Sequence, residues 1–150
     1  MTQKYNVAVA GATGAVGTEI VQILEERNFP IDKLFLLASS KSKGKKVEFR
    51  DQEIIVEDLS EFDFSNAHIG LFSPGGKISA EFAPKAAKAG CIVIDNTSHF
   101  RMQQNIPLVV PEVNANALDD FFDDENRTNI ISNPNCSTIQ MVVALKPLHE

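Results

Sequence analysis

Short apolar runs alternate along the chain with stretches in which apolar side chains recur every three or four positions. Uninterrupted apolar runs of this length predict buried strands, and the longer periodic stretches predict amphipathic helices. The strand-like runs lie at residues 5–10, 34–38, 69–73, 92–95 and 130–132. Helices are predicted over residues 16–26, over the alanine-rich residues 79–89 and from Cys136 onward. This alternation predicts an α/β fold with a doubly wound, mostly parallel sheet.

Three weaker patterns predict smaller elements. Residues 46–49 and 53–56 flank a polar turn and predict a hairpin, which would be an antiparallel addition to the sheet. Residues 108–110 predict a short strand before Pro111, and residues 117–122 predict a helical turn.

A glycine-rich turn, Gly11-Ala12-Thr13-Gly14-Ala15-Val16-Gly17, joins the first predicted strand to the first predicted helix. Glycine permits a tight turn and lets the backbone approach a phosphate group, and the helix that follows presents unpaired N–H groups. The spacing G-x-x-G-x-x-G between a strand and a helix is therefore typical of the pyrophosphate site of a dinucleotide-binding unit. The alternative is a tight turn that binds nothing.

The end of the second predicted strand bears on the choice of cofactor. An NAD site usually has an Asp or Glu there, which holds the ribose hydroxyls of the adenosine. This chain instead has Ser39-Ser40-Lys41-Ser42-Lys43-Gly44-Lys45-Lys46, which contains hydroxyls and lysines and no acid. Such groups suit a 2′-phosphate, so the loop favours NADP over NAD. The alternative is a basic loop that is merely solvated.

Two further loops follow predicted strands and should lie at the same edge of the sheet. Gly75 and Gly76 follow residues 69–73, where one of them either contacts the cofactor or provides a positive φ for the turn. Arg101 follows residues 92–95 and suits bidentate binding of a phosphate or carboxylate, although a plain surface charge is the alternative. His99 is interpreted as a loop histidine.

Cys136 stands at the predicted start of the last helix, after the turn Asn133-Pro134-Asn135. A helix N-terminus favours the thiolate form of a cysteine, and its free N–H groups can hold an oxyanion formed when a carbonyl is attacked. Cys136 is therefore a candidate nucleophile. The alternative is that Asn135 or Ser137 caps the helix and Cys136 only packs. Cys91, within an apolar run, is predicted to be a small buried residue.

Composition narrows the possible functions. The 150 residues include 14 basic and 20 acidic side chains, and the resulting net charge of −6 argues against nucleic-acid binding. No apolar run is long enough to cross a membrane. Two cysteines do not make a disulfide framework, which favours a reducing cytoplasm. The acidic residues 119–125 surround two phenylalanines and lack metal-ligand spacing, so no metal site is predicted.

Five segments of the chain are similar to segments of bacterial aspartate-semialdehyde dehydrogenases and occur in the same order. They are the glycine turn, residues 39–45, Asp95-Asn96-Thr97-Ser98-His99-Phe100-Arg101, Val110-Pro111-Glu112-Val113-Asn114 and Asn133-Pro134-Asn135-Cys136-Ser137-Thr138. Because these motifs are independent and cover essentially the whole chain, the resemblance is specific. It implies a Rossmann-like domain and an NADP-dependent, phosphorylating aldehyde dehydrogenase.

The reaction implied by the resemblance is the NADPH-dependent reductive dephosphorylation of L-aspartyl 4-phosphate to L-aspartate 4-semialdehyde, through a thioacyl intermediate on cysteine. It belongs to the biosynthesis of lysine, threonine and methionine. The resemblance implies Cys136 as the nucleophile, and Arg101 and Asn135 as residues that bind phosphate or substrate. The expected NADP(H) contacts are Gly11, Thr13, Gly14, Ala15, Val16, Ser39, Ser40, Lys41, Ser42 and Gly76. Members of the family often have arginine where Lys41 stands, and a lysine would relax the selectivity for NADP.

Members of this family are considerably longer than 150 residues. The resemblance therefore implies that residues 1–132 are the NADP-binding domain and that residues 133–150 begin a catalytic and dimerisation domain. The acid–base histidine, the glutamine that orients the acyl group and the arginine that binds the substrate carboxylate are expected in that second domain. The 150-residue chain alone is thus expected to be inactive, and the full-length protein to be a cytoplasmic homodimer or homotetramer.

Two alternatives remain at this stage. The N-acetyl-glutamyl-phosphate reductases catalyse the same type of reaction, but carry glycine and tyrosine around their cysteine where this chain has Asn135 and Ser137. A non-enzymatic dinucleotide-binding module is the other alternative. Such a module has no need of an activated thiol, so the reactivity of Cys136 distinguishes it from the enzyme.

Overall fold

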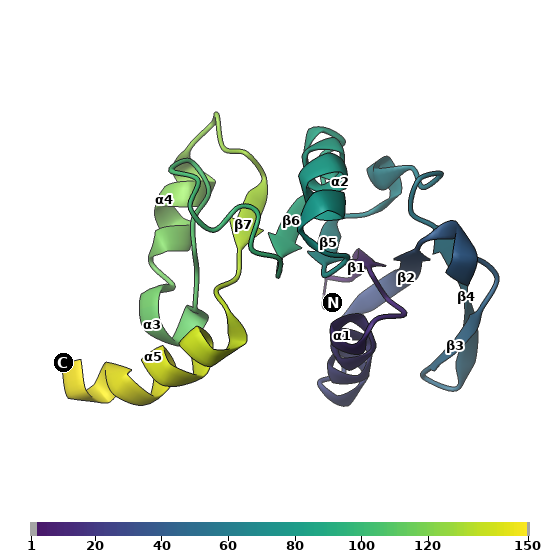
Figure 1. The fold of residues 1–150 in the computed structure, drawn as a ribbon, viewed down its shortest axis with the longest axis horizontal. Coiled ribbons are helices and arrows are strands. Elements are labelled where there is room, and N and C mark those ends of the chain that lie inside the picture. Colours follow the sequence, from purple (N-terminus) through teal and green to yellow (C-terminus); the bar gives the residue numbers. More distant parts are fainter. Residues whose placement is uncertain (1–2, 150) are drawn as a thin grey trace.

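A computed structural model describes residues 3–149 and contains one seven-stranded sheet, with strand order β3-β4-β2-β1-β5-β6-β7 (Figure 1). The strands are β1 Tyr5–Ala10, β2 Ile31–Ala38, β3 Lys46–Phe49, β4 Gln52–Asp58, β5 Ile69–Phe72, β6 Ile92–Asp95 and β7 Ile130–Ser132. The helices are α1 Ala15–Glu26, α2 Gly76–Lys88, α3 Pro111–Asn114, α4 Ala117–Asp123 and α5 Cys136–His149, with short 3₁₀ turns η1 Ser40–Ser42 and η2 Phe64–Asn66.

The predicted α/β fold with a doubly wound, mostly parallel sheet is confirmed. Every pair of neighbouring strands runs parallel except β3 with β4. From β1 the chain builds outward through β2 and β4 on one side, and through β5, β6 and β7 on the other. The strand order therefore reverses between β1 and β5, which is where ligands bind in open α/β sheets.

Two predictions about the smaller strands were wrong in part. The predicted hairpin is present, because β3 and β4 pair antiparallel, but only β3 is an antiparallel addition, because β4 also pairs in parallel with β2 and continues to Asp58. The strand predicted at residues 108–110 is a single bridge between Leu108 and Ser132. The ladder stops there because its next two donors would be Pro111 and Pro134, and proline has no N–H to donate.

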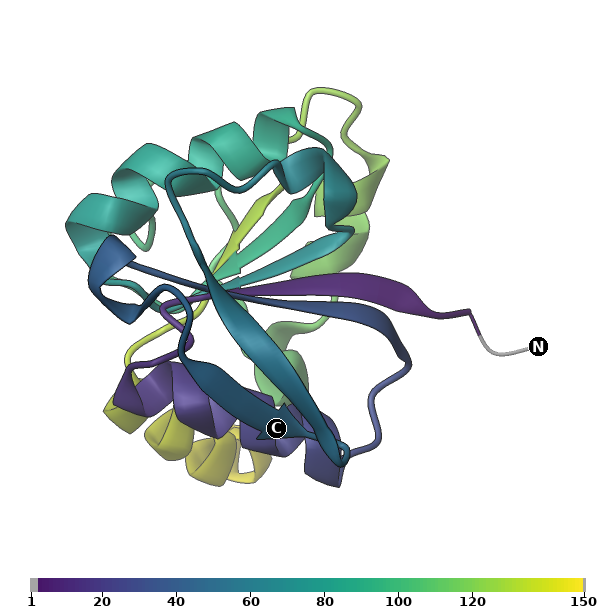
Figure 2. The same ribbon diagram turned by 90° about the vertical axis from the view of Figure 1, so that its right-hand side faces the viewer.

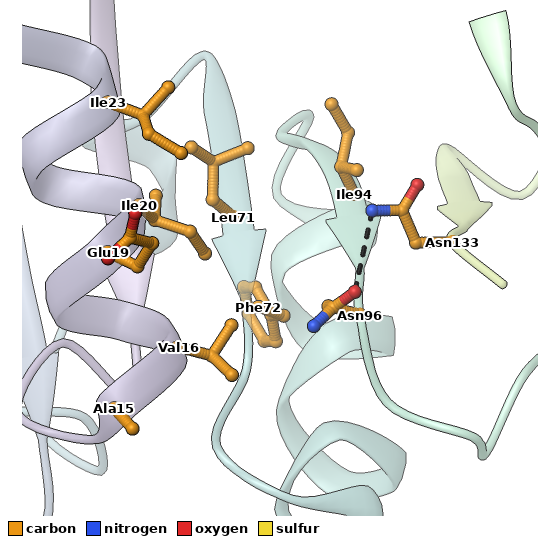
Figure 3. A pocket seen from close by; sticks show the side chains of 10 residues that line it. All are labelled: Ala15, Val16, Glu19, Ile20, Ile23, Leu71, Phe72, Ile94, Asn96 and Asn133. Atoms are coloured by element: carbon orange, nitrogen blue, oxygen red, sulfur yellow. Dashed lines mark hydrogen bonds between the residues drawn. The ribbon is translucent and has the colours of Figure 1, made fainter. Parts of the chain in front are cut away.

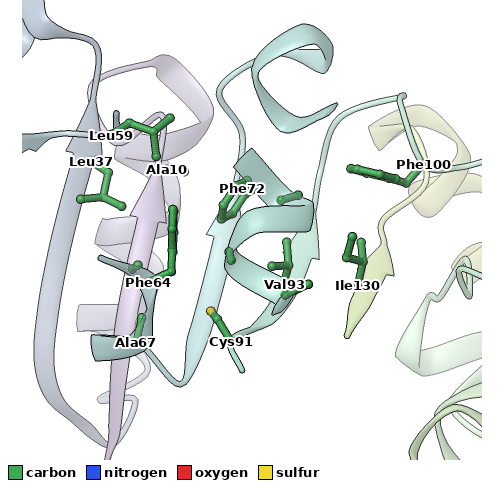
Figure 4. Close-up of a cluster of buried hydrophobic side chains, with 14 of the residues drawn as sticks. Ala10, Leu37, Leu59, Phe64, Ala67, Phe72, Cys91, Val93, Phe100 and Ile130 are labelled. Atoms are coloured by element: carbon green, nitrogen blue, oxygen red, sulfur yellow. The ribbon is translucent and has the colours of Figure 1, made fainter. Parts of the chain in front are cut away.

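The central strand β1 shows how the core is divided. Its side chains alternate across the sheet, as strand geometry requires, so that Val7 and Val9 pack toward α1 while Ala8 and Ala10 face α2. Figure 2 shows α1 and α2 on opposite faces of the sheet. The buried cluster on the α2 side includes Phe72 and Val93 (Figure 4). These last four side chains of β1 are fully buried, which holds the end of the strand, and with it the glycine turn, in place.

The C-terminal elements are less enclosed. α3 and α4 follow the loop after β6, and Phe121 of α4 packs against Ile131 of β7. α5 has no buried residue, although it carries the large apolar side chains Met141, Leu145 and Leu148. None of the helices within residues 3–149 is long and apolar enough to cross a membrane.

Candidate functional site

The three glycines of the turn have different roles. Gly11 has φ of +84°, and a Cβ at this position would lie 2.8 Å from the carbonyl group of Ser73. A Cβ on Gly17 would lie 2.0 Å from the carbonyl oxygen of Gly11, so α1 can approach the turn only because Gly17 has no side chain. Gly14 has an ordinary φ of −82° and is exposed, and a Cβ there would meet only the Gly11 oxygen, at 3.4 Å. The fold therefore requires Gly11 and Gly17, whereas Gly14 leaves open space.

The N-terminus of α1 is open toward that space. Gly14 is the N-cap residue, and no side chain caps the helix. The first N–H groups of a helix have no partner within the helix, and here they belong to Ala15, Val16 and Gly17. Their positive dipole end suits an anionic group beside the turn.

A cleft of about 510 Å³ opens between the glycine turn, the end of β2 and the end of β4. Its lining residues are Gly11, Thr13, Gly14, Ala38, Ser39, Ser40, Asp58, Leu59, Ser60, Ser73, Pro74, Ile78 and Phe82. Five of the predicted cofactor residues thus line one cleft. Its far wall comes from the end of β4 and from α2 and was not predicted from the sequence. Recognising β4 as a parallel strand would have predicted this wall, because the carboxyl ends of parallel strands reach the same edge of the sheet.

The predicted loop after β2 forms the outer rim of this cleft. Two of its lysines are neutralised, because Lys43 pairs with Glu61 and Lys46 pairs with Glu53. The ion pair with Glu61 raises the pKa of Lys43 above its usual value. Lys41 is exposed and forms no ion pair with any residue between 3 and 149, so its charge is available to a ligand.

Ala15 and Val16 line a different hollow, of about 520 Å³, on the α1 face of the sheet (Figure 3). Ile20 and Ile23 of α1 face Leu71 of β5 across it, and Ile94 of β6 completes its apolar floor. Asn96 and Asn133 lie at its polar end, where the Asn133 amide donates to the Asn96 side chain at 3.5 Å. Seven of the ten predicted cofactor residues are therefore divided between two hollows on either side of the glycine turn, whereas Lys41, Ser42 and Gly76 line neither.

Arg101 joins the loop after β6 to the loop after β7. Its Nε donates to the carbonyl oxygen of Asn133 at 2.8 Å, and its Nη2 donates to that of Asn96 at 3.0 Å. The backbone of Asn133 is also bonded to the end of β6, because its N–H donates to the carbonyl oxygen of Asp95 at 2.8 Å. These bonds fix the segment that leads into Cys136.

The Asp95 carboxylate anchors the same region from inside the fold. It is fully buried, and it accepts hydrogen bonds from the hydroxyl of Ser79 at 2.6 Å and from that of Thr97 at 2.7 Å. Both carboxylate oxygens are thus satisfied, as a buried charge requires. α2 and the 96–101 loop are tied to β6 by this group.

Cys136 is exposed at the first position of α5. The side-chain oxygen of Asn135 accepts the N–H of Ser137 at 2.9 Å, which is an N-cap contact, and lies 4.0 Å from the Cys136 sulfur. Asn135 is therefore placed both as a helix cap and as a neighbour of the thiol. Cys91 is buried as predicted, and burial raises the pKa of its thiol to about 12.

The remaining candidates lie near this edge without joining the cleft. Gly75 carries the positive φ of the turn after β5, at +95°, and Gly76 begins α2, where a Cβ would meet only His99, at 4.0 Å. His99 is an exposed loop residue, as interpreted from the sequence, and packs edge-on against Phe100. Within residues 3–149 no group of three or more potential ligands is arranged to hold a metal ion.

A doubly wound sheet with a glycine turn and an open helix N-terminus beside its switch point defines the class of dinucleotide-binding domains. The family described as the NAD binding domain of semialdehyde dehydrogenase matches residues 6–121, and the chain belongs to this family.

Individual relatives are similar over the full chain. The curated aspartate-semialdehyde dehydrogenase 2 of Vibrio cholerae is 58% identical over 150 residues, which are 100% of this chain and 43% of that protein. The crystal structure of aspartate semialdehyde dehydrogenase II from Vibrio cholerae complexed with ASA matches with a TM-score of 0.93 and 57% identity, covering 98% of this chain and 47% of that one. The Candida albicans enzyme with NADP matches with a TM-score of 0.77 and 26% identity, over 97% of this chain and 47% of that one. The chain thus spans less than half the length of these relatives.

Proposed function

We propose that this chain is the cofactor-binding portion of an NADP-dependent aspartate-semialdehyde dehydrogenase, which forms L-aspartate 4-semialdehyde from L-aspartyl 4-phosphate. The observation that carries the proposal is the position of an exposed cysteine, Cys136, at the same sheet edge as the open glycine turn. β7 lies three strands from β1, so the two sites are separated by about 14 Å across the sheet. An extended dinucleotide bound at the turn spans such a distance.

The chemistry assigned to Cys136 is acyl transfer. Its thiolate attacks the carbonyl carbon of the acyl phosphate, the bond from that carbon to the phosphate oxygen breaks, and inorganic phosphate leaves. NADPH, when bound, supplies the hydride that converts the resulting thioester to the aldehyde. The C–S bond then breaks and the thiolate is regenerated. The exposed sulfur at the start of α5 supports this role, because the neighbouring N–H groups can hold the carbonyl oxygen as it gains charge.

Arg101 and Asn135 are proposed to bind the phosphate and the acyl group. Arg101 uses Nε and Nη2 for the two loop carbonyls, and its Nη1 donates to no other residue in the described part of the chain. That nitrogen remains for a phosphate oxygen. The role of Arg101 is then double, since the same side chain positions the Cys136 segment and binds the leaving group.

Selectivity for NADP is assigned to Lys41 and to the hydroxyls of Ser39, Ser40 and Ser42. The cleft beside Gly14 has room for the adenosine half of the cofactor, and Lys41 forms no ion pair within residues 3–149. Gly76 is assigned to the nicotinamide side because it does not line this cleft and a Cβ there would meet only His99, at 4.0 Å. Ala15 and Val16 contribute the main-chain N–H groups of α1 to the pyrophosphate.

We assign residues 1–132 to the cofactor domain and residues 133–150 to the start of a catalytic and dimerisation domain. The support is α5, whose apolar side chains Met141, Leu145 and Leu148 are left exposed by residues 3–149. Further chain would cover this helix and supply the missing acid–base and substrate-binding residues. The whole protein is proposed to act on a small-molecule substrate as a cytoplasmic homodimer or homotetramer, and the 150-residue chain alone to be inactive.

Calorimetric titration of this chain with NADPH and NADH tests the cofactor assignment. NADPH is expected to bind measurably more tightly than NADH. A thermal melting curve on the same sample shows whether the chain is folded. A cooperative melt together with no binding of either cofactor would contradict the proposed function, because the cleft would then be present and unused.

A further inference from the structure

The cleft beside the glycine turn contains one acidic side chain, Asp58. It is the last residue of β4 and pairs in register with Ala38, the last residue of β2. Asp58 is only 9% exposed, and it lines the cleft together with Leu59 and Ser60. A carboxylate at this depth requires polar partners, because burying an unpaired charge is costly.

Only one oxygen of that carboxylate is satisfied by the protein. Oδ1 of Asp58 accepts two hydrogen bonds from Ser60, from its N–H at 2.9 Å and from its hydroxyl at 2.7 Å. Oδ2 accepts none from any residue between 3 and 149. The bonds from the Ser60 hydroxyl and N–H hold the pKa of Asp58 below its usual range. The group is therefore ionised at neutral pH, and its free oxygen can only accept a hydrogen bond.

The surroundings of Asp58 suit a flat, mostly apolar ring. Leu59, Pro74, Ile78 and Phe82 line the same part of the cleft. Leu59 is itself anchored in the buried cluster beside Leu37 and Ala10 (Figure 4). Leu59 is therefore held in place by the core, and the four side chains together present apolar surface against which a base can lie.

The position along the sheet matches the base end of a bound dinucleotide. The glycine turn follows β1, the serine and lysine loop follows β2, and Asp58 follows β4. Neighbouring strands are about 4.8 Å apart, so Asp58 lies about 10 Å across the sheet from the glycine turn. With the pyrophosphate at the turn and the ribose at the end of β2, the base lies at the end of β4.

We propose that Oδ2 of Asp58 accepts a hydrogen bond from the 6-amino group of the adenine ring, so that this residue selects adenine dinucleotides. The inference rests on the proposed binding of a dinucleotide in this cleft. A base with an oxygen at position 6, such as hypoxanthine, would place an acceptor against an acceptor. The negative charge of Asp58 disfavours binding of the 2′-phosphate beside it, so Lys41 is the residue expected to bind that phosphate.

The test compares NADPH with its hypoxanthine analogue, reduced nicotinamide hypoxanthine dinucleotide phosphate, by calorimetric titration of this chain. The unchanged chain is expected to bind NADPH about 10-fold to 100-fold more tightly than the analogue, as expected for one lost hydrogen bond to a buried charged group. Equal affinities for the two compounds would overturn the proposal while leaving dinucleotide binding intact. No binding of either by the folded chain would instead overturn the proposed function itself.

The variant D58N sharpens the test, because the Ser60 bonds fix the orientation of the new side chain. Its Oδ1 continues to accept from Ser60, so its Nδ2 replaces the free oxygen and becomes a donor. The variant is expected to bind the hypoxanthine analogue more tightly than NADPH, a reversal of preference. The matched control is E57Q, which removes the same charge from an exposed neighbouring side chain that does not line the cleft, and should keep the preference for NADPH.

A loss of affinity in D58N that is the same for both compounds would contradict base recognition. Loss confined to NADH and its hypoxanthine analogue, with NADPH unaffected, would assign Asp58 to the ribose hydroxyls and equally contradict it. Melting curves of the two variants establish that each is folded under the conditions of the titration.

Discussion

The hydroxyl of Thr13 donates a hydrogen bond to the hydroxyl of Ser42 at 3.3 Å. The two residues are 29 positions apart, and the bond joins the glycine turn directly to the loop that follows β2. The turn proposed to hold the pyrophosphate and the loop proposed to hold the 2′-phosphate are therefore one connected surface. A ligand that binds to both the turn and the loop therefore meets groups whose relative positions are already fixed.

Replacement of Lys41 by alanine is expected to weaken NADPH binding about 10-fold and to leave NADH binding unchanged, because the lysine is proposed to contact only the additional phosphate. Titration calorimetry with each cofactor measures the two affinities. K45A is the matched control, since Lys45 is exposed in the same loop and does not line the cleft. Equal losses for both cofactors in K41A would remove the assignment of Lys41 to the 2′-phosphate.

The glycine turn allows binding and folding to be separated. Gly14→Ala is expected to lower the free energy of unfolding by less than about 1 kcal/mol, because its φ suits alanine and no atom lies closer than 3.4 Å. The same change is expected to weaken NADPH binding at least 10-fold, because the new methyl group occupies the space proposed for the pyrophosphate. Denaturant unfolding and cofactor titration on one sample measure both effects.

Gly17→Ala is the complementary variant. A Cβ there would lie 2.0 Å from the Gly11 oxygen, so α1 or the turn must move, and the loss of stability is expected to be about 3 kcal/mol or more. Unfolding midpoints of the two variants give the comparison directly. If Gly14→Ala proved the more destabilising of the two, the division of roles within the turn would be wrong.

Much of this fold was predictable because its parallel strands are buried on both faces and read as apolar runs. β1 is the clearest case, with Val7, Ala8, Val9 and Ala10 fully buried. β4 was predicted too short, and its parallel pairing with β2 was not predicted, because its last residues, Glu57 and Asp58, are acidic. The structure accommodates a buried acid there by means of Ser60, a pairing that hydrophobic patterning does not reveal.

The candidate site also contains residues that the sequence could predict and residues that it could not. Residues that directly follow an apolar strand, such as Gly11 and Ser39, were predictable because parallel strands bring their carboxyl ends to one edge. Ile78 and Phe82 line the cleft from within α2, and a helical pattern alone does not show which face meets a cleft. The dual contact of Arg101 with two loop carbonyls was equally invisible, because it depends on loops 32 residues apart meeting in space.

The free energy of unfolding is expected to fall at acidic pH in part because of two aspartates, Asp58 and Asp63. Asp58 and Asp63 each accept hydrogen bonds from a serine two residues later, which holds the pKa of both carboxyl groups below their usual range in the folded chain. A depressed folded-state pKa stabilises the fold above the unfolded-state value, and this contribution disappears as the pH falls through the folded-state value. The double variant D58N/D63N is therefore expected to be less stable than the unchanged chain at neutral pH, with the difference shrinking below about pH 4. Unfolding free energies measured between pH 7 and pH 2 give the profile, and a difference that grew on acidification would contradict this account.

The two cysteines should react at very different rates. Cys91 is fully buried with a thiol pKa of about 12, so at pH 7 about one such thiol in 100,000 is ionised. Cys136 is exposed at the first position of α5, so its sulfur is accessible to a reagent in solution. Iodoacetamide at pH 7 is therefore expected to label Cys136 in the folded chain while Cys91 stays unlabelled, as measured by peptide mass spectrometry. Urea should expose Cys91 to the same reagent, and C136S should abolish labelling of the folded chain. Preferential labelling of Cys91 under native conditions would contradict both the burial of that residue and the assignment of Cys136 as the nucleophile.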